Sequence, residues 1–168
     1  MGKRAARTAI VPRVALIGPD AAVLEEWACD LRPHHLVARL GDPERAVRQV
    51  ESERFEVMVV DLDFRDASAI GLLGRLRWAH PGAETIVVSE PVPADIVVAA
   101  MRLGASDFLC KPLAGPDALA RHVAEAVARG KSAEPRPDSP VEMLCGAGVP
   151  GSGGRPPNYM RERRRLLA

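Results

Sequence analysis

Aromatic residues are scarce in this chain, at 4% of 168 residues, so aromatic packing cannot be the basis of its core. Hydrophobic residues nevertheless make up 47% of the sequence, and valine, leucine, isoleucine and alanine must therefore build the core. This length and composition are typical of one globular domain with a terminal extension.

Cysteine is also rare, and its distribution excludes a disulfide framework. Cys29, Cys110 and Cys145 are odd in number and show no framework spacing. Cys110 lies in an apolar run, where we expect a buried thiol that packs as a small hydrophobic group. This usage of cysteine favours a reducing compartment, and we expect a cytoplasmic protein.

The sequence has neither a large net charge nor a long apolar segment. Its formal net charge is +1, which provides no general attraction to nucleic acid or membrane. Residues 1–11 are a basic N-terminal extension, and Pro12 and Arg13 interrupt the apolar stretch at its end. No run of about 20 apolar residues follows, so we expect no membrane span and no secretion signal.

Short apolar runs alternate with segments of helical periodicity from residue 12 to residue 131. The predicted strands are Val14–Ile17, Leu36–Leu40, Val57–Val60, Thr85–Val88 and Phe108–Cys110. The predicted helices begin at Asp20, at Asp42-Pro43, near Ser68, at Ala94 and before Leu119, and the last one ends at Gly130. This alternation predicts an α/β fold, a doubly wound five-stranded parallel sheet with helices on both faces.

Proline and glycine become frequent after Lys131. Such a segment cannot bury enough apolar surface to offset the entropy of ordering it. We therefore predict a domain over residues 12–131 and a flexible tail rich in proline and glycine over residues 132–168. The tail contains no helix-turn-helix pattern, so we expect no intrinsic DNA binding.

Reactive side chains stand at the ends of three predicted strands. Asp61 follows Val57–Val60, Ser89 follows Thr85–Val88, and Lys111 follows the fifth strand. Ligands of doubly wound sheets bind beyond the carboxyl ends of the strands, so these side chains should lie at one edge. A carboxylate there can attack a phosphoryl donor, while a hydroxyl and an ammonium group bind the phosphoryl oxygens.

The residues around these positions resemble the receiver domain of bacterial two-component response regulators. The resemblance covers about residues 12–130 and is carried by Asp61-Leu62-Asp63, Leu72-Leu73-Gly74-Arg75-Leu76-Arg77, Pro81, Ile86-Val87-Val88-Ser89 and the run from Ala100 to Lys111-Pro112. The segment Ala100-Met101-Arg102-Leu103-Gly104-Ala105 is most similar to receivers that precede enhancer-binding ATPase modules.

The resemblance implies a flavodoxin-like sheet in the order 2-1-3-4-5 and a role in phosphorelay signal transduction rather than an enzyme activity. It also implies that Asp61 is the phosphoacceptor and that Ser89, Phe108 and Lys111 are the switch and phosphate-binding residues. The implied partners are a histidine kinase or phosphotransfer protein and a downstream output protein. A homodimer through the fourth helix, fifth strand and fifth helix is a further expectation.

The acidic part of the site departs from the family pattern. Receivers usually carry two acids after the first strand, where Gly18 and Pro19 stand here. Mg²⁺ prefers octahedral oxygen ligands, including carboxylates, so we expect only weak Mg²⁺ binding, with Asp61, Asp20 and Asp63 as candidate ligands. For Asp20 we favour a role as the N-cap of the first helix over one as a metal ligand. Restoring both acids, as Gly18→Asp plus Pro19→Asp, should strengthen metal binding.

Three functions stay open from the sequence alone. The chain is a phosphorylated signalling switch, or a phosphorylation-independent pseudo-receiver that serves as a protein–protein interaction module, or the receiver fragment of a transcriptional regulator without its output domain. Glu90 bears on this choice, because a carboxylate there would repel an incoming phosphoryl group.

Overall fold

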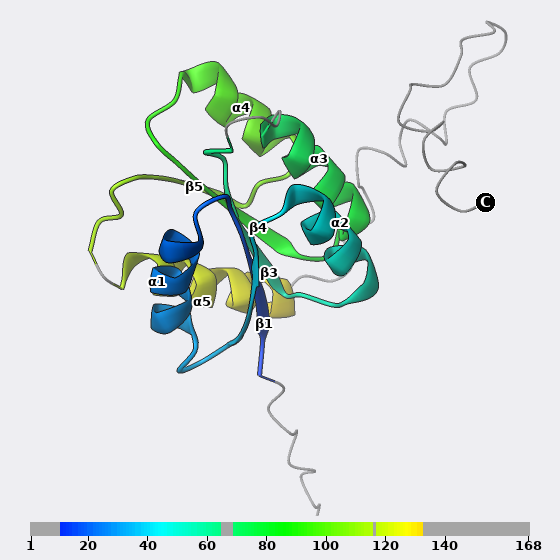
Figure 1. The fold of residues 1–168 in the computed structure, drawn as a ribbon, viewed down its shortest axis with the longest axis vertical. Coiled ribbons are helices and arrows are strands. Elements are labelled where there is room, and N and C mark those ends of the chain that lie inside the picture. The colour runs from blue at the N-terminus through cyan, green and yellow to red at the C-terminus, as the bar shows by residue number, and fades with distance from the viewer. Residues whose placement is uncertain (1–10, 65–68, 116, 133–168) are drawn as a thin grey trace, which may run out of the picture. The chain divides into compact units, whose positions relative to one another are not determined.

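A five-stranded parallel sheet in the order β2-β1-β3-β4-β5 lies at the centre of the computed structural model (Figure 1). The structure describes residues 11–64, 69–115 and 117–132, so the predicted tail beyond Ser132 and residues 1–10 lie outside the described residues. The strands are β1 (Arg13–Ile17), β2 (Leu36–Leu40), β3 (Val57–Asp61), β4 (Glu84–Ser89) and β5 (Asp107–Cys110). The predicted doubly wound sheet and its strand order are confirmed.

The register of the central strands positions the site residues. In β3 the run Val57–Val60 is fully buried, as expected for a strand whose two faces are both covered by helices. Asp61 ends this strand and pairs with Val88 of β4, so Ser89 follows one residue further along the neighbouring strand. Because the strands are parallel, Asp61 and Ser89 emerge at the same edge of the sheet.

Helices cover both faces of the sheet. They are α1 (Ala21–Leu31), α2 (Pro43–Ser52), α3 (Ala69–Ala79), α4 (Ala94–Arg102) and α5 (Ala118–Ser132). One apolar cluster joins the sheet to α1 and α5, through residues such as Leu24 and Leu119. A second cluster joins the opposite face to α2, α3 and α4, through residues such as Val50 and Leu73. Figure 1 shows α1 and α5 together on one side of the strands.

The first two helices begin where the sequence predicts. The Asp20 carboxylate accepts hydrogen bonds from the backbone N–H groups of Ala22 and Val23, at 2.8 and 3.3 Å. The Asp42 carboxylate accepts one from the N–H of Arg45 at 2.7 Å, and Pro43 occupies the first helical position. Each cap satisfies N–H groups that have no partner within the helix.

Two local predictions are wrong. Cys110 is exposed rather than buried, because it ends β5, an edge strand with a single neighbour. The last helix continues past Gly130 to Ser132, since the buried stripe that includes Leu119 and Val123 holds it to the sheet. A glycine in a helix costs only about 1 kcal/mol, which this packing offsets. Within residues 11–64, 69–115 and 117–132, no helix has the length and apolar character needed to cross a bilayer.

Candidate functional site

Asp61 and Lys111 form a close ion pair at the carboxyl edge of the sheet. The Asp61 side chain is 1% exposed, and its Oδ2 accepts a hydrogen bond from Lys111 Nζ at 2.7 Å. Asp61 ends β3, and Lys111 follows β5, so residues 50 positions apart meet because the strands are parallel. The sequence prediction that these two side chains share one edge agrees with this geometry.

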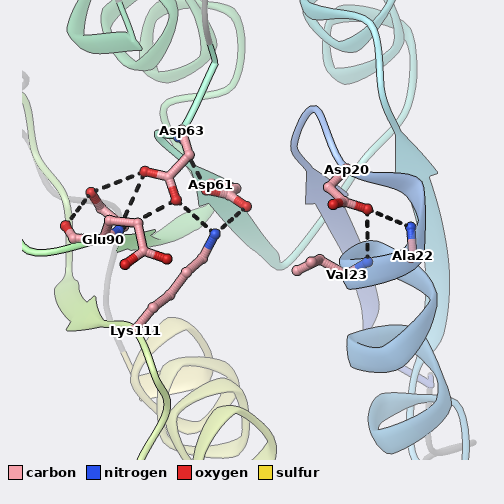
Figure 2. A network of polar contacts seen from close by, with 8 residues as sticks. Asp20, Ala22, Val23, Asp61, Asp63, Glu90 and Lys111 are labelled. Carbon is pink, nitrogen blue, oxygen red and sulfur yellow. Dashed lines mark hydrogen bonds and ion pairs between the residues drawn. The ribbon is translucent and has the colours of Figure 1, made fainter.

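Asp63 is a second acid in contact with the same lysine. Its Oδ2 accepts a hydrogen bond from Lys111 Nζ at 2.8 Å, so the ammonium group bridges two carboxylates (Figure 2). The backbone N–H of Asp63 also donates to Asp61 Oδ1 at 3.1 Å. The Asp63 side chain is 29% exposed, so it lies at the mouth of the site while Asp61 lies at its base.

The residues at the end of β4 bind Asp63 as well. The Glu90 N–H donates to both carboxylate oxygens of Asp63, at 3.3 Å each. The buried Ser89 hydroxyl donates to the Glu90 carbonyl oxygen at 2.7 Å and, more weakly, to Asp63 Oδ1 at 3.4 Å. The Glu90 residue itself is exposed, and its backbone rather than its carboxylate takes part in these bonds. Ser89 therefore lies beside Asp63 at this edge.

Burial and charge act in opposite directions on the two acids. Burial raises the pKa of the Asp61 carboxyl, and the hydrogen bond from Lys111 offsets this only in part. Burial also disfavours the charged form of Asp63, but the Lys111 ammonium and the Glu90 N–H hold its pKa below the usual value. Burial alone would lower the pKa of Lys111, yet its two carboxylate partners raise it. Asp63 is thus the acid that the network holds ionised most strongly.

Trp27 is a neighbour of the lysine that the sequence did not identify as a site residue. Lys111 Nζ lies 5.7 Å from the centre of the Trp27 ring, within the range of a cation–π contact. Trp27 belongs to the buried stripe of α1, and the sequence predicted it only as a core residue. The bond between Lys111 and Pro112 is cis.

Phe108 lies on β5, away from the carboxylates. It is half-buried and packs against the apolar cluster that includes Ala100 of α4. Its position pairs with Val87 of β4. The residue therefore packs on the side of the sheet that α4 covers.

Asp20 does not join the two acids. Its carboxylate is directed at the start of α1 and accepts the cap bonds from Ala22 and Val23 (Figure 2). Asp20 and Asp61 do line the same open cleft, together with Pro19 and Lys111. Both cap hydrogen bonds are accepted by Oδ1, so Oδ2 is the oxygen through which Asp20 would bind a metal ion without loss of the cap.

The described residues do not fit a dedicated Mg²⁺ site. Among residues 11–64, 69–115 and 117–132 no group of three or more histidine, cysteine, aspartate or glutamate side chains is placed to hold a metal ion. The two acids that are close together, Asp61 and Asp63, both bind the Lys111 ammonium. Mg²⁺ demands a near-ideal oxygen octahedron, which this donor set does not offer.

Gly18 packs so closely against Asp61 that an acidic side chain does not fit at this position. A Cβ atom at Gly18 would lie 2.8 Å from Asp61 Cβ and 3.2 Å from Leu24 Cδ2. Real Cβ atoms essentially never lie as close as 2.8 Å to a neighbour, so a side chain at Gly18 requires Asp61 or the loop at Gly18 to shift. The substitutions Gly18→Asp and Pro19→Asp should therefore be tested separately. Pro19 is exposed, whereas Gly18 is buried against Asp61.

Comparison with known proteins identifies the family. The response regulator receiver domain matches residues 20–124. The chain is 27% identical over 128 residues to the protein-glutamate methylesterase/protein-glutamine glutaminase of group 2 operon of Rhodospirillum centenum, covering 72% of this chain and 32% of that protein. It is 24% identical over 168 residues to the photosynthetic apparatus regulatory protein RegA of Rhodobacter capsulatus, covering 91% and 89%. The chain thus spans about a third of the methylesterase.

A solved structure confirms the fold. The CheY-like response regulator receiver domain protein from Methanospirillum hungatei JF-1 superposes with a TM-score of 0.69 at 20% identity, and the match covers 73% of this chain and 98% of that one.

Proposed function

Because this chain belongs to the response regulator receiver domain family of two-component signalling, we propose that Asp61 is its phosphoacceptor. The observation that carries this proposal is the pair of Asp61 with Lys111 at 2.7 Å, at the carboxyl edge of a parallel sheet. A buried carboxylate can act as a nucleophile toward phosphorus. The ammonium group beside it stabilises the negative charge that develops on the phosphoryl oxygens. Ser89 lies at the same edge and supplies a hydroxyl donor.

The chemistry that fits this arrangement is transfer from a phosphorylated histidine. An Asp61 carboxylate oxygen attacks phosphorus, a P–O bond forms as the P–N bond of the donor breaks, and the leaving imidazole takes up a proton. Lys111 then binds one oxygen of the acyl phosphate as a point charge. Receiver domains interact in general with histidine kinases, and we propose a histidine kinase or a phosphotransfer protein as the donor.

Receiver domains generally bind Mg²⁺ at their phosphorylation site. In this chain we propose weak Mg²⁺ binding, with Asp61 and Asp63 as the ligands that remain and Asp20 retained as the helix cap. The closed Lys111 bridge supports this proposal, because a metal ion has to compete with the ammonium group for both carboxylates.

We also propose that α4, β5 and α5 form the face that contacts a downstream output protein or a second copy of the chain. Val98 and Met101 of α4 are apolar and 47% and 46% exposed. Phe108 packs beneath α4 and connects it to β5. The receiver domain is a signalling domain, and we propose that this chain acts in the cytoplasm without an enzyme activity of its own.

The test is chemical labelling. Incubation with acetyl phosphate and Mg²⁺ should add one acid-labile phosphoryl group per chain, and Asp61→Asn should abolish it. Asp30→Asn, which removes an exposed carboxylate of α1 at the same cleft, is the matched control and should label normally. Labelling that persists in Asp61→Asn would move the acceptor to another residue, with Asp63 the first candidate. A parent protein that never labels, even with a phosphorylated histidine donor, would favour the phosphorylation-independent module.

A further inference from the structure

Asp63 occupies the donors that a phosphoryl group on Asp61 needs. Two donors bind its carboxylate, Lys111 Nζ at 2.8 Å and the Glu90 N–H at 3.3 Å from each oxygen. The Ser89 hydroxyl lies 3.4 Å from Asp63 Oδ1, but its shorter bond, at 2.7 Å, goes to the Glu90 carbonyl oxygen. They come from the ends of β4, which pairs with the strand that carries Asp61, and of β5, which pairs with β4. Figure 2 shows the Asp63 carboxylate between the Glu90 backbone and the Lys111 side chain.

We infer that Asp63 is an internal competitor, a carboxylate that binds the phosphoryl-binding donors of the resting site and must leave them before Asp61 is modified. This inference rests on Asp61 being the phosphoacceptor. A phosphoryl group brings three strong acceptor oxygens, and a carboxylate brings two. Both are anionic acceptors that draw on the same donors: the Glu90 N–H has a single hydrogen to give, and the Lys111 ammonium divides its three among all its acceptors.

The geometry makes this competition effective. Asp63 lies two residues after Asp61 on the same strand end, and its N–H donates to Asp61 Oδ1, so its position relative to the phosphoacceptor is fixed. A tethered group competes at a high effective concentration, because it pays no translational entropy on binding.

The competition by Asp63 makes phosphorylation of Asp61 less favourable, and this effect is separate from the weak binding of Mg²⁺. Opening the site breaks the charge-assisted bond between Asp63 and Lys111, and it leaves the Asp63 carboxylate near the incoming phosphoryl group. Asp63→Asn removes the negative charge with almost no change in shape. The amide oxygen still accepts a hydrogen bond, but it binds the ammonium group less strongly than a carboxylate does.

The test compares anion binding in Asp63→Asn and in the parent. Beryllofluoride, which adds to an aspartate carboxylate as a phosphoryl mimic, is titrated at a fixed excess of Mg²⁺. Trp27 is the reporter, since it lies 5.7 Å from Lys111 Nζ, and Trp78→Phe in every protein leaves it as the single tryptophan. We expect Asp63→Asn to bind beryllofluoride at least about tenfold more tightly than the parent.

The control variant is Glu26→Gln, which removes an exposed negative charge from the same cleft without touching these donors. It should change the affinity less than about threefold, since exposed charges are screened. If Glu26→Gln gains as much beryllofluoride affinity as Asp63→Asn, the gain reflects the general loss of negative charge in the cleft. That result would overturn the inference that Asp63 competes for the donors. A loss of affinity in Asp63→Asn would overturn it in the other direction, because the contribution of Asp63 to Mg²⁺ binding would then outweigh its competition for the donors.

Failure of binding in both the parent and Asp63→Asn would also overturn the inference, since the variant should leave the donors open. The acetyl phosphate experiment on Asp61→Asn is read separately. Labelling that survives Asp61→Asn refutes the phosphoacceptor assignment, whereas equal beryllofluoride affinities with normal Asp61 labelling refute only the competition by Asp63.

Discussion

Neutralising the two ends of the Asp61–Lys111 pair should change stability in opposite directions. Burial raises the pKa of Asp61, so the folded state favours the uncharged carboxyl, and Asp61→Asn supplies an uncharged side chain of the same shape. Each unit by which a pKa is raised corresponds to about 1.4 kcal/mol. We expect Asp61→Asn to raise the free energy of unfolding at neutral pH by on the order of 1 kcal/mol.

Lys111→Met should have the reverse effect, because it leaves two carboxylates close together without a counter-charge. Removing one partner of a fully buried ion pair costs about 3–5 kcal/mol. The Lys111 and Asp63 side chains are 18% and 29% exposed, so water reduces the penalty, and we expect a loss of about 2 kcal/mol. Urea unfolding monitored by circular dichroism measures both changes. The exposed controls Asp30→Asn and Lys131→Met should stay within about 0.5 kcal/mol of the parent.

The pH dependence follows from the direction of each shift. Asp61 has a raised folded-state pKa, so its ionisation costs stability above that pKa, and the cost disappears as the pH falls below the unfolded value of about 3.9. The advantage of Asp61→Asn over the parent should therefore be full at neutral pH and vanish in acid. Lys111 has a raised pKa, so its contribution is full below the unfolded value of about 10.4 and is lost as the pH rises through the folded value. If Asp61→Asn destabilises the domain at pH 7 as much as Lys111→Met, the assignment of burial as the dominant influence on Asp61 is wrong.

Further predictions concern the first loop and the first helix. Pro19→Asp adds an oxygen ligand to the cleft and should increase Mg²⁺ affinity in a calorimetric titration, whereas a parent that binds Mg²⁺ equally well would contradict the degenerate-site explanation. Gly18→Asp should instead lower the urea midpoint, because its Cβ would lie 2.8 Å from that of Asp61; an unchanged midpoint would show that the loop moves freely. Asp20→Ala should cost about 1 kcal/mol of stability through the lost cap while leaving Mg²⁺ affinity unchanged, and a fall in that affinity would return Asp20 to the metal ligands.

The sheet was predictable because each strand corresponds to a short apolar run that can be recognised from neighbouring residues alone. Val57–Val60 is an uninterrupted apolar run in which all residues except Met58 are β-branched, and Asp42-Pro43 is a helix start that needs no tertiary information. The wrong predictions are those that depend on position within the sheet. The exposure of Cys110 follows from the edge position of β5, and the passage of α5 through Gly130 follows from packing against the sheet.

The site was predictable in its residue types but not in its contacts. The order of strands brings Asp61 and Lys111 together, so their pairing followed from the fold. The bridge from Lys111 to Asp63 and the bonds from the Glu90 N–H depend on loop conformations that no periodicity encodes. The close contact between Gly18 and Asp61 could not be predicted either, because the sequence shows only that position 18 lacks an acidic residue.

The phosphoacceptor assignment is tested most directly by mapping the modified residue. The protein is phosphorylated by a histidine donor and reduced with borohydride, which converts an aspartyl phosphate to homoserine, and its peptides are then sequenced by mass spectrometry. The structure leads us to expect homoserine at position 61 alone, with none in the Asp61→Asn variant. Homoserine at position 63, or phosphorylated protein without homoserine at either position, would contradict the assignment.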